Sequence, residues 1–152
     1  MNIRSILLPT DFSECADAAL PYAVQMARTT QARLICLHVV EPMLPPVGYA
    51  PVAEPLPAVD IGEQLQASAE RELPKLAERE ECAGLEVEEI IAHGEAASEI
   101  VRVARERDVD LIVISSHGRT GFGRMLFGST AESVVRHAHC PVLVVKPKSS
   151  AE

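Results

Sequence analysis

The residues best suited to chemistry in this sequence lie in one glycine-rich stretch, residues 115–130, which reads SSHGRTGFGRMLFGST. Four of the eight glycines of the chain fall within it. An apolar run typical of a buried strand precedes the stretch, and a helical pattern follows it. A helix that begins after a glycine-rich turn presents free backbone N–H groups and the positive end of its dipole, and glycine lets the backbone approach an anion closely. The stretch therefore predicts a phosphate-binding site.

Two familiar phosphate-binding motifs fit this stretch poorly. The dinucleotide fingerprint GxGxxG fails because Gly121 and Gly123 are followed by the next glycine only at position 128. The P-loop pattern GxxxxGK[ST] nearly fits, since Gly123 and Gly128 have the right separation and Thr130 stands in the Ser/Thr position. Ser129, however, replaces the lysine that would clamp the phosphates. The loop is therefore not that of a P-loop NTPase.

Several candidate residues have a structural role as an alternative, which the sequence leaves open. Asp11 contacts a ligand, caps the first helix or braces the turn before it. Ser129 opens the capping box Ser129-Thr130-Ala131-Glu132, so it acts as a helix cap, a phosphate contact or both. His117 either touches a ligand or packs, and Arg119 and Arg124 are either phosphate contacts or exposed loop side chains.

The sequence offers no group of residues that favours catalysis or metal binding. We find no nucleophile–base pair and no pair of carboxylates placed for general acid–base work. The sequence His137-x-His139-Cys140 lacks a fourth ligand at zinc spacing and spans the end of a helix and the start of a strand. His38 and His93 are expected to be structural. We therefore predict no catalytic residue and no protein-held metal.

Composition and charge narrow the possible partners. The 152 residues are 47% hydrophobic and carry a net charge of -8, which disfavours nucleic acid and anionic membranes as partners. The start of the chain does not resemble a signal peptide, and no stretch is apolar enough to span a bilayer. The four cysteines are widely separated, which is typical of reduced thiols. We expect a cytoplasmic protein.

The elements that must position the candidate site alternate between strand and helix patterns. Apolar runs predict strands at residues 3–8, 32–40, 85–91, 110–115 and 141–145. Helical patterns cover 13–28, 61–80, 95–107 and 129–138. Pro21 is expected to kink the first helix or shift its start, and Pro74 is expected to interrupt the second in the same way. Residues 41–60 hold six of the 11 prolines, which predicts a proline-rich loop that is either a mobile connection or a lid or docking segment.

This alternation predicts a single-domain α/β fold with an open five-stranded parallel sheet and helices on both faces. We favour the strand order 3-2-1-4-5 over 2-1-3-4-5. Ligands of such sheets bind beyond the carboxyl ends of the strands where the winding direction reverses, here between strands 3–8 and 110–115. Asp11 follows the first of these strands and the glycine-rich stretch follows the second, so both candidates meet at one place.

The chain resembles the universal stress protein family. Its nucleotide loop, G-x2-G-x9-G-[ST], is matched by Gly118, nine residues, then Gly128-Ser129. The sequences Pro9-Thr10-Asp11-Phe12-Ser13, Leu37-His38-Val39 and Cys140-Pro141-Val142-Leu143-Val144-Val145 are similar to further segments of the family, in the same order over nearly the whole chain. The first glycine of the loop pattern is Ser115 here, where a side chain would crowd the sugar or add a hydrogen bond.

The resemblance implies a Rossmann-like fold of the adenine nucleotide alpha hydrolase type over residues 1–148, with residues 149–152 as a C-terminal tail. It also implies that ATP or AMP is bound, with Mg²⁺ on the phosphates. Asp11 would meet the adenine or ribose end, and Pro9, Thr10 and Val39 would form a slot for the base. Phosphates would be held by Gly118, Gly128, Ser129 and Thr130. Ile114, Ser115, His117 and Arg119 complete the candidate nucleotide-binding set.

The last strand, Val142–Val145, would lie at a sheet edge, where unpaired N–H and C=O groups invite pairing. A homodimer that joins two such edges is one solution, and the resemblance implies the same dimer; alternatively, the tail from Lys146 to Glu152 covers the edge. Three functions remain open. The first is a nucleotide-binding stress-response regulator with no or slow hydrolysis and an unidentified protein partner. The second is a weak ATPase, and the third is a nucleotide-independent dimeric interaction module.

Overall fold

The computed structural model describes residues 2–42, 60–118 and 127–148, and within them the chain alternates strands and helices. The strands are β1 (Ser5–Pro9), β2 (Arg33–Val40), β3 (Val87–His93), β4 (Leu111–Ser115) and β5 (Val142–Val145). The helices are α1 (Glu14–Asp17), α2 (Leu20–Thr30), α3 (Ile61–Ala77), the 3-10 turn η1 (Glu80–Cys82), α4 (Ala96–Glu106) and α5 (Ser129–His137). All strand pairs are parallel in the order β3-β2-β1-β4-β5, which confirms the predicted fold and strand order.

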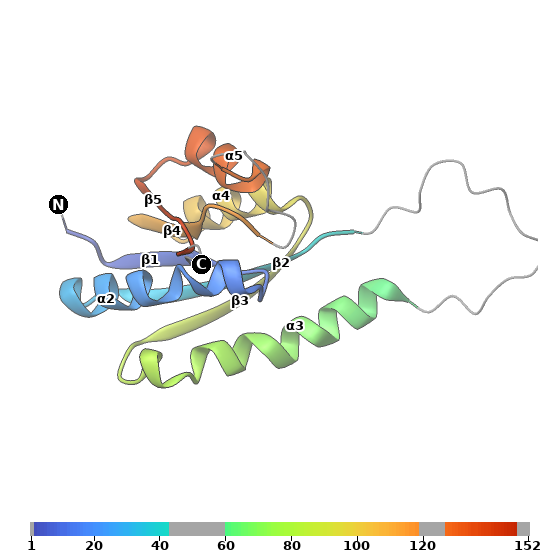
Figure 1. Cartoon of the computed structure of the whole chain (residues 1–152), viewed down its shortest axis with the longest axis horizontal. Helices are drawn as coiled ribbons and strands as arrows, with labels where there is room; N and C mark the ends of the chain where they lie inside the picture. The colour runs from blue at the N-terminus through green and yellow to red at the C-terminus, as the bar shows by residue number, and fades with distance from the viewer. Residues whose placement is uncertain (1, 43–59, 119–126, 149–152) are drawn as a thin grey trace, which may run out of the picture.

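The helices cover both faces of the sheet, so the central strands are buried on both sides (Figure 1). Side chains alternate along β1: Ile6 and Leu8 pack into a cluster with α2 and α3, while Leu7 packs into a second cluster with α4 and α5. This alternation follows from the two-residue period of a strand. Two apolar clusters therefore hold β1 and β4 side by side.

Asp110 fixes the amino ends of β1 and β4. Its Oδ2 accepts hydrogen bonds from the backbone N–H groups of Arg4 at 2.8 Å and Ser5 at 3.0 Å. The bond from the Arg4 N–H is the main cause that lowers the pKa of the Asp110 carboxyl, and the bond from Ser5 adds to it. Directly after this contact the two strands pair in register, with Ile6 opposite Leu111 and Leu7 opposite Ile112. The carboxyl ends of both strands consequently open at the same edge of the sheet.

The two prolines affect their helices differently. The helix expected from residue 13 is divided into α1 and α2, and Pro21 occupies the second position of α2, where a missing N–H costs no helical hydrogen bond. Pro74 lies inside α3, which nevertheless continues to Ala77. The interruption expected at Pro74 is therefore wrong, because the apolar face of α3 stays buried at Leu73 and Leu76 on either side of it.

Several segments with features expected from the sequence lie wholly or partly outside the described residues. Most of the proline-rich loop, the tail 149–152, and Arg119 and Arg124 of the glycine-rich stretch are not described. No helix in the described ranges is both long and apolar enough to cross a membrane. All four cysteines are free thiols.

Candidate functional site

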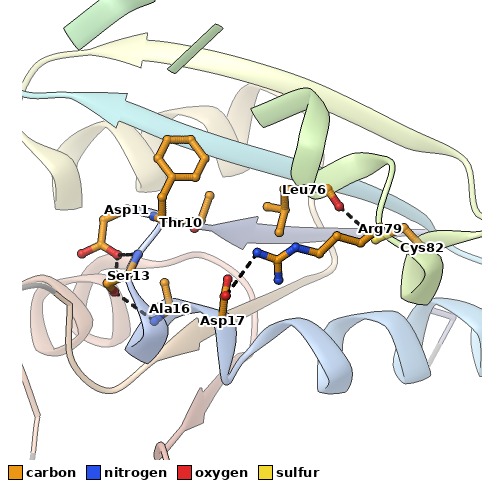
Figure 2. A network of polar contacts seen from close by, with 9 residues as sticks. Thr10, Asp11, Ser13, Ala16, Asp17, Leu76, Arg79 and Cys82 are labelled. Carbon is orange, nitrogen blue, oxygen red and sulfur yellow. Dashed lines mark hydrogen bonds and ion pairs between the residues drawn. The ribbon is translucent and has the colours of Figure 1, made fainter. Parts of the chain in front are cut away.

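A tightly bonded turn follows β1 and presents Asp11 (Figure 2). The Asp11 Oδ1 atom accepts hydrogen bonds from the Ser13 backbone N–H at 3.0 Å and from the Ser13 hydroxyl at 2.5 Å. The Ser13 Oγ accepts in turn from the N–H of Ala16, which caps α1. Asp11 therefore braces the turn, the structural role that the sequence left open, while Ser13 is the cap.

The turn contains a residue in an uncommon conformation. Phe12 has φ 62°, in the left-handed region that bulky residues seldom adopt. Its N–H donates to Thr10 Oγ1 at 3.0 Å, and its ring stacks on the His38 ring with centroids 4.5 Å apart. The Thr10 carbonyl contacts His38 Nδ1 at 2.8 Å. Since Phe12 and His38 come from neighbouring strand ends, β2 supports the turn that follows β1.

The end of β4 is held by bonds that the sequence did not predict. The Ser115 hydroxyl donates to the His117 carbonyl at 2.9 Å, and the backbone N–H of Ser116 donates to Val145 at 2.8 Å. The Ser116 Oγ lies 2.9 Å from His117 Nδ1. Ser115 does not have a positive φ, so its backbone has no need of glycine. The hydroxyl of Ser115, which stands where the family pattern has glycine, therefore forms a hydrogen bond within its own loop.

Two glycines allow the close approach of these segments. A Cβ atom on Gly118 would lie 2.6 Å from Asp11 Oδ2, which shows that the carboxylate lies directly over the Gly118 backbone. A Cβ atom on Gly128 would lie 3.2 Å from the Ser116 carbonyl oxygen, which accepts the Gly128 N–H at 2.6 Å. Neither glycine has a positive φ, so both positions require small size rather than an unusual backbone. The structure thus brings Asp11, Gly118 and Gly128 to the same edge of the sheet.

Helix α5 begins at this edge, one residue away from the expected cap. Gly128 is the N-cap and Ser129 is the first helical residue, so the capping box with Ser129 as the cap is wrong. The Glu132 carboxylate pairs with Arg136 at 2.8 Å instead of reaching back to the cap. The first bond of the helix runs from the Glu132 N–H to Gly128. The N–H groups of Ser129, Thr130 and Ala131 therefore lack partners within the helix and suit an anion.

The remaining candidates lie around the same strand ends. Pro9 ends β1 opposite Leu37, and Val39 is two positions further along β2. Ile114 is buried near the end of β4, and Val39 packs against the same apolar cluster. Arg119 lies outside the described residues. Phe12 and Ser116 are the residues of this edge that sequence reasoning left unassigned, and His38 was expected only to be structural. Tertiary contacts alone reveal what each of them does.

The described residues contain no group of three or more His, Cys, Asp or Glu side chains close enough to hold a metal ion. His137 Nδ1 lies 2.9 Å from the Ser133 carbonyl of its own helix. The Cys140 thiol is half-buried, and burial is the main cause that raises its pKa. The chemistry of the strand ends suits an anion at the start of α5 and hydrogen-bond donors at Asp11.

Comparison with known proteins gives one consistent result. The model of the Universal stress protein family matches residues 2–146. Universal stress protein MJ0531 of Methanocaldococcus jannaschii is 36% identical over 147 residues, which cover 94% of this chain and 82% of that protein. Universal stress protein MJ0577 of the same organism is 32% identical over 158 residues, which cover 97% of each chain.

Solved structures show the same fold. The structure of hypothetical protein MJ0577 superposes with a TM-score of 0.80 at 29% identity and covers 99% of this chain and 100% of that chain. A universal stress protein from Archaeoglobus fulgidus in complex with dAMP superposes with a TM-score of 0.67 at 26% identity, covering 96% and 100%.

Proposed function

Because this chain belongs to the universal stress protein family, we propose that it is a nucleotide-binding regulator of the stress response, which binds ATP or AMP where β1 and β4 end. One observation carries the proposal: Asp11 lies over Gly118, so the turn after β1, residues 116–118 after β4 and Gly128 at the start of α5 form one surface. The dAMP complex of the Archaeoglobus fulgidus neighbour supports an adenine nucleotide as the ligand.

The chemistry of the two ends of this surface sets the orientation of the nucleotide. The Asp11 carboxylate only accepts hydrogen bonds and repels phosphate, so it suits the ribose hydroxyls or the adenine amino group. The N–H groups of Ser129 and Thr130 attract negative charge. Phosphates therefore lie at Gly128, Ser129 and Thr130, with His117 and Arg119 nearby along the chain. Gly118, which the resemblance assigned to the phosphates, lies beneath the Asp11 carboxylate and so belongs to the ribose side of the site. The base lies in the slot of Pro9, Thr10 and Val39, and Ile114 and Ser115 at the end of β4 complete the site.

We expect Mg²⁺ to arrive with the phosphates of ATP, because the described residues form no metal-binding cluster. Removing Mg²⁺ with a chelator should then weaken ATP binding and leave AMP binding nearly unchanged. The four free thiols fit a reducing cytoplasm, where we expect the protein to act on a protein partner according to its nucleotide state.

A calorimetric titration of nucleotide-stripped protein with Mg-ATP and with AMP tests this function. In Ser129→Asp the new charge at the first position of α5 favours the helix but repels phosphate, so ATP affinity should fall at least about tenfold while the fold is kept. Gln25→Glu adds the same charge on the exposed face of α2 and should bind ATP like the wild type. If wild-type protein binds neither nucleotide at millimolar concentration, the function is that of a nucleotide-independent interaction module.

Phosphate release measured over many turnovers separates a sensor from a weak ATPase. We expect no or slow hydrolysis, since the sequence offers no nucleophile–base pair beside the phosphates. Sustained release that disappears in Ser129→Asp would make the protein an ATPase instead.

We further propose a homodimer that pairs two β5 strands at the sheet edge. Pro141 accepts a bond from Ile112 in β4, and Val145 accepts one from Ser116 directly after it. The alternate residues Val142 and Val144 therefore direct their N–H and C=O groups away from β4. Val144→Pro removes one outward N–H without breaking a bond to β4, and should convert a dimer into a folded monomer. Val144→Ala loses similar packing but keeps the N–H, and should remain dimeric in sedimentation velocity. A wild-type monomer would contradict the dimer and favour coverage by the tail.

A further inference from the structure

The turn that carries Asp11 is held in a conformation that its own sequence disfavours. Phe12 has φ 62°, and a bulky side chain in this region costs free energy that only surrounding contacts can offset. Two local hydrogen bonds fix part of the turn: the Phe12 N–H donates to Thr10 Oγ1, and the Ser13 N–H donates to Asp11 Oδ1. These bonds lie within the turn itself and do not attach it to the rest of the protein.

His38 supplies that attachment with two contacts. The Thr10 carbonyl oxygen can only accept, so His38 Nδ1 carries the hydrogen and donates it across 2.8 Å. The same imidazole stacks on the Phe12 ring, with centroids 4.5 Å apart and planes inclined by 26°. One ring therefore holds both neighbours of Asp11 in the chain.

The backbone around His38 is held on both sides by neighbouring strands. It lies in β2, which pairs with β1 on one side and with β3 on the other, where His38 itself is in register with Ile91. A side chain on such a strand has little freedom to follow a moving turn. The N–H of Thr10 also donates to Leu37, the residue before His38, at 2.8 Å.

We propose that His38 is a positioning residue of the nucleotide site, whose imidazole holds the Thr10–Ser13 turn in its strained form and so keeps the Asp11 carboxylate over Gly118. This inference rests on the function proposed above, in which Asp11 meets the adenine or ribose end. His38 touches the backbone of the turn and the Phe12 ring, and it acts on the nucleotide through Asp11.

Two substitutions separate the contacts of His38. His38→Asn keeps a donor near the position of Nδ1 but loses the ring, and His38→Phe keeps a ring but loses the donor. Each should weaken ATP affinity about tenfold, because one of the two contacts that offset the strain is gone. Phe12→Gly removes both the backbone strain and the ring that stacks on His38, so the imidazole of His38 no longer has strain to offset. In the Phe12→Gly background His38→Asn should therefore change ATP affinity by less than about twofold.

Hydrogen exchange of the nucleotide-free protein gives a second readout that does not depend on the function. In His38→Asn the Ser13 N–H, which is bonded to Asp11, should exchange at least about tenfold faster, while the Val113 N–H in the core strand β4 should keep its rate. A general loss of stability would instead accelerate both amides. Unchanged Ser13 exchange in His38→Asn, or the same loss of affinity with and without Phe12→Gly, would overturn the proposal.

The two proposals fail in different ways. If wild-type protein binds no nucleotide, the proposed function fails, and Ser13 exchange still decides whether His38 holds the turn. If wild-type protein binds ATP and His38→Asn binds it equally well, the function stands and the positioning role of His38 is refuted.

Discussion

Replacing Gly118 by alanine should destabilise the protein through a single atom, Asp11 Oδ2. The added Cβ would lie 2.6 Å from this atom, so the carboxylate must move away. Its other oxygen accepts two hydrogen bonds from Ser13, which that movement breaks or stretches. Hydrogen bonds to a charged group contribute about 1.5–3 kcal/mol when buried, and Asp11 is only half-buried, so we expect Gly118→Ala to lower the free energy of unfolding by about 1–2 kcal/mol.

Two backgrounds isolate this contact in urea denaturation followed by circular dichroism. In Asp11→Ala the obstructing atom is absent, and since Gly118 has no positive φ, alanine should change the free energy of unfolding by less than about 0.5 kcal/mol. In Asp11→Asn an atom remains at the position of Oδ2, so the cost should persist. An equal cost of Gly118→Ala in the wild-type and Asp11→Ala backgrounds would refute this reading of the site.

Three further measurements test the framework of the site. Ser115→Ala removes the bond to the His117 carbonyl and should lower the free energy of unfolding by about 1 kcal/mol in urea denaturation, whereas no change would mean that the hydroxyl has no such role. The ionised Asp110 carboxylate, whose pKa is lowered in the fold, stabilises the protein above the unfolded value of 3.8, and this stabilisation is lost as the pH falls further. The free energy of unfolding of Asp110→Asn should therefore fall less steeply between about pH 5 and 3 than that of the wild type or of the neighbouring control Asp108→Asn. Burial raises the pKa of the Cys36 thiol to about 12 and also raises that of Cys82, so a thiol reagent at neutral pH should modify both only after unfolding. If mass spectrometry finds the reagent on either cysteine of the native protein, the burial of that thiol is contradicted.

The fold could be predicted because its signals are local and repeated. Apolar runs mark the buried strands, and the handedness of parallel crossovers leaves few ways to connect them. The meeting of Asp11 with the glycine-rich stretch follows from the strand order, since ligands bind where the winding reverses. These predictions depend on residue types and spacing alone.

The details that sequence reasoning missed depend on contacts between distant segments. The helix cap lies at Gly128 rather than Ser129 because the bond from the Gly128 N–H to Ser116 fixes where α5 begins. The left-handed conformation of Phe12 depends on surroundings that include His38 on another strand. Helix α3 continues past Pro74 because its apolar face packs on the sheet. Local propensity says nothing of these partners.

The pairing of β1 with β4 has a consequence for the order in which the chain acquires its structure. Ser5 and Asp110, which join the two strands, are 105 positions apart, whereas β2, whose Arg33 is in register with Ser5, follows β1 closely in the chain. During translation, the backbone N–H and C=O groups on one edge of β1 must therefore stay unpaired until most of the chain has left the ribosome, and an incomplete chain exposes an edge that invites aggregation. A small molecule that spans Asp11 and α5 would bind only the finished product, and would protect it from unfolding in proportion to its concentration.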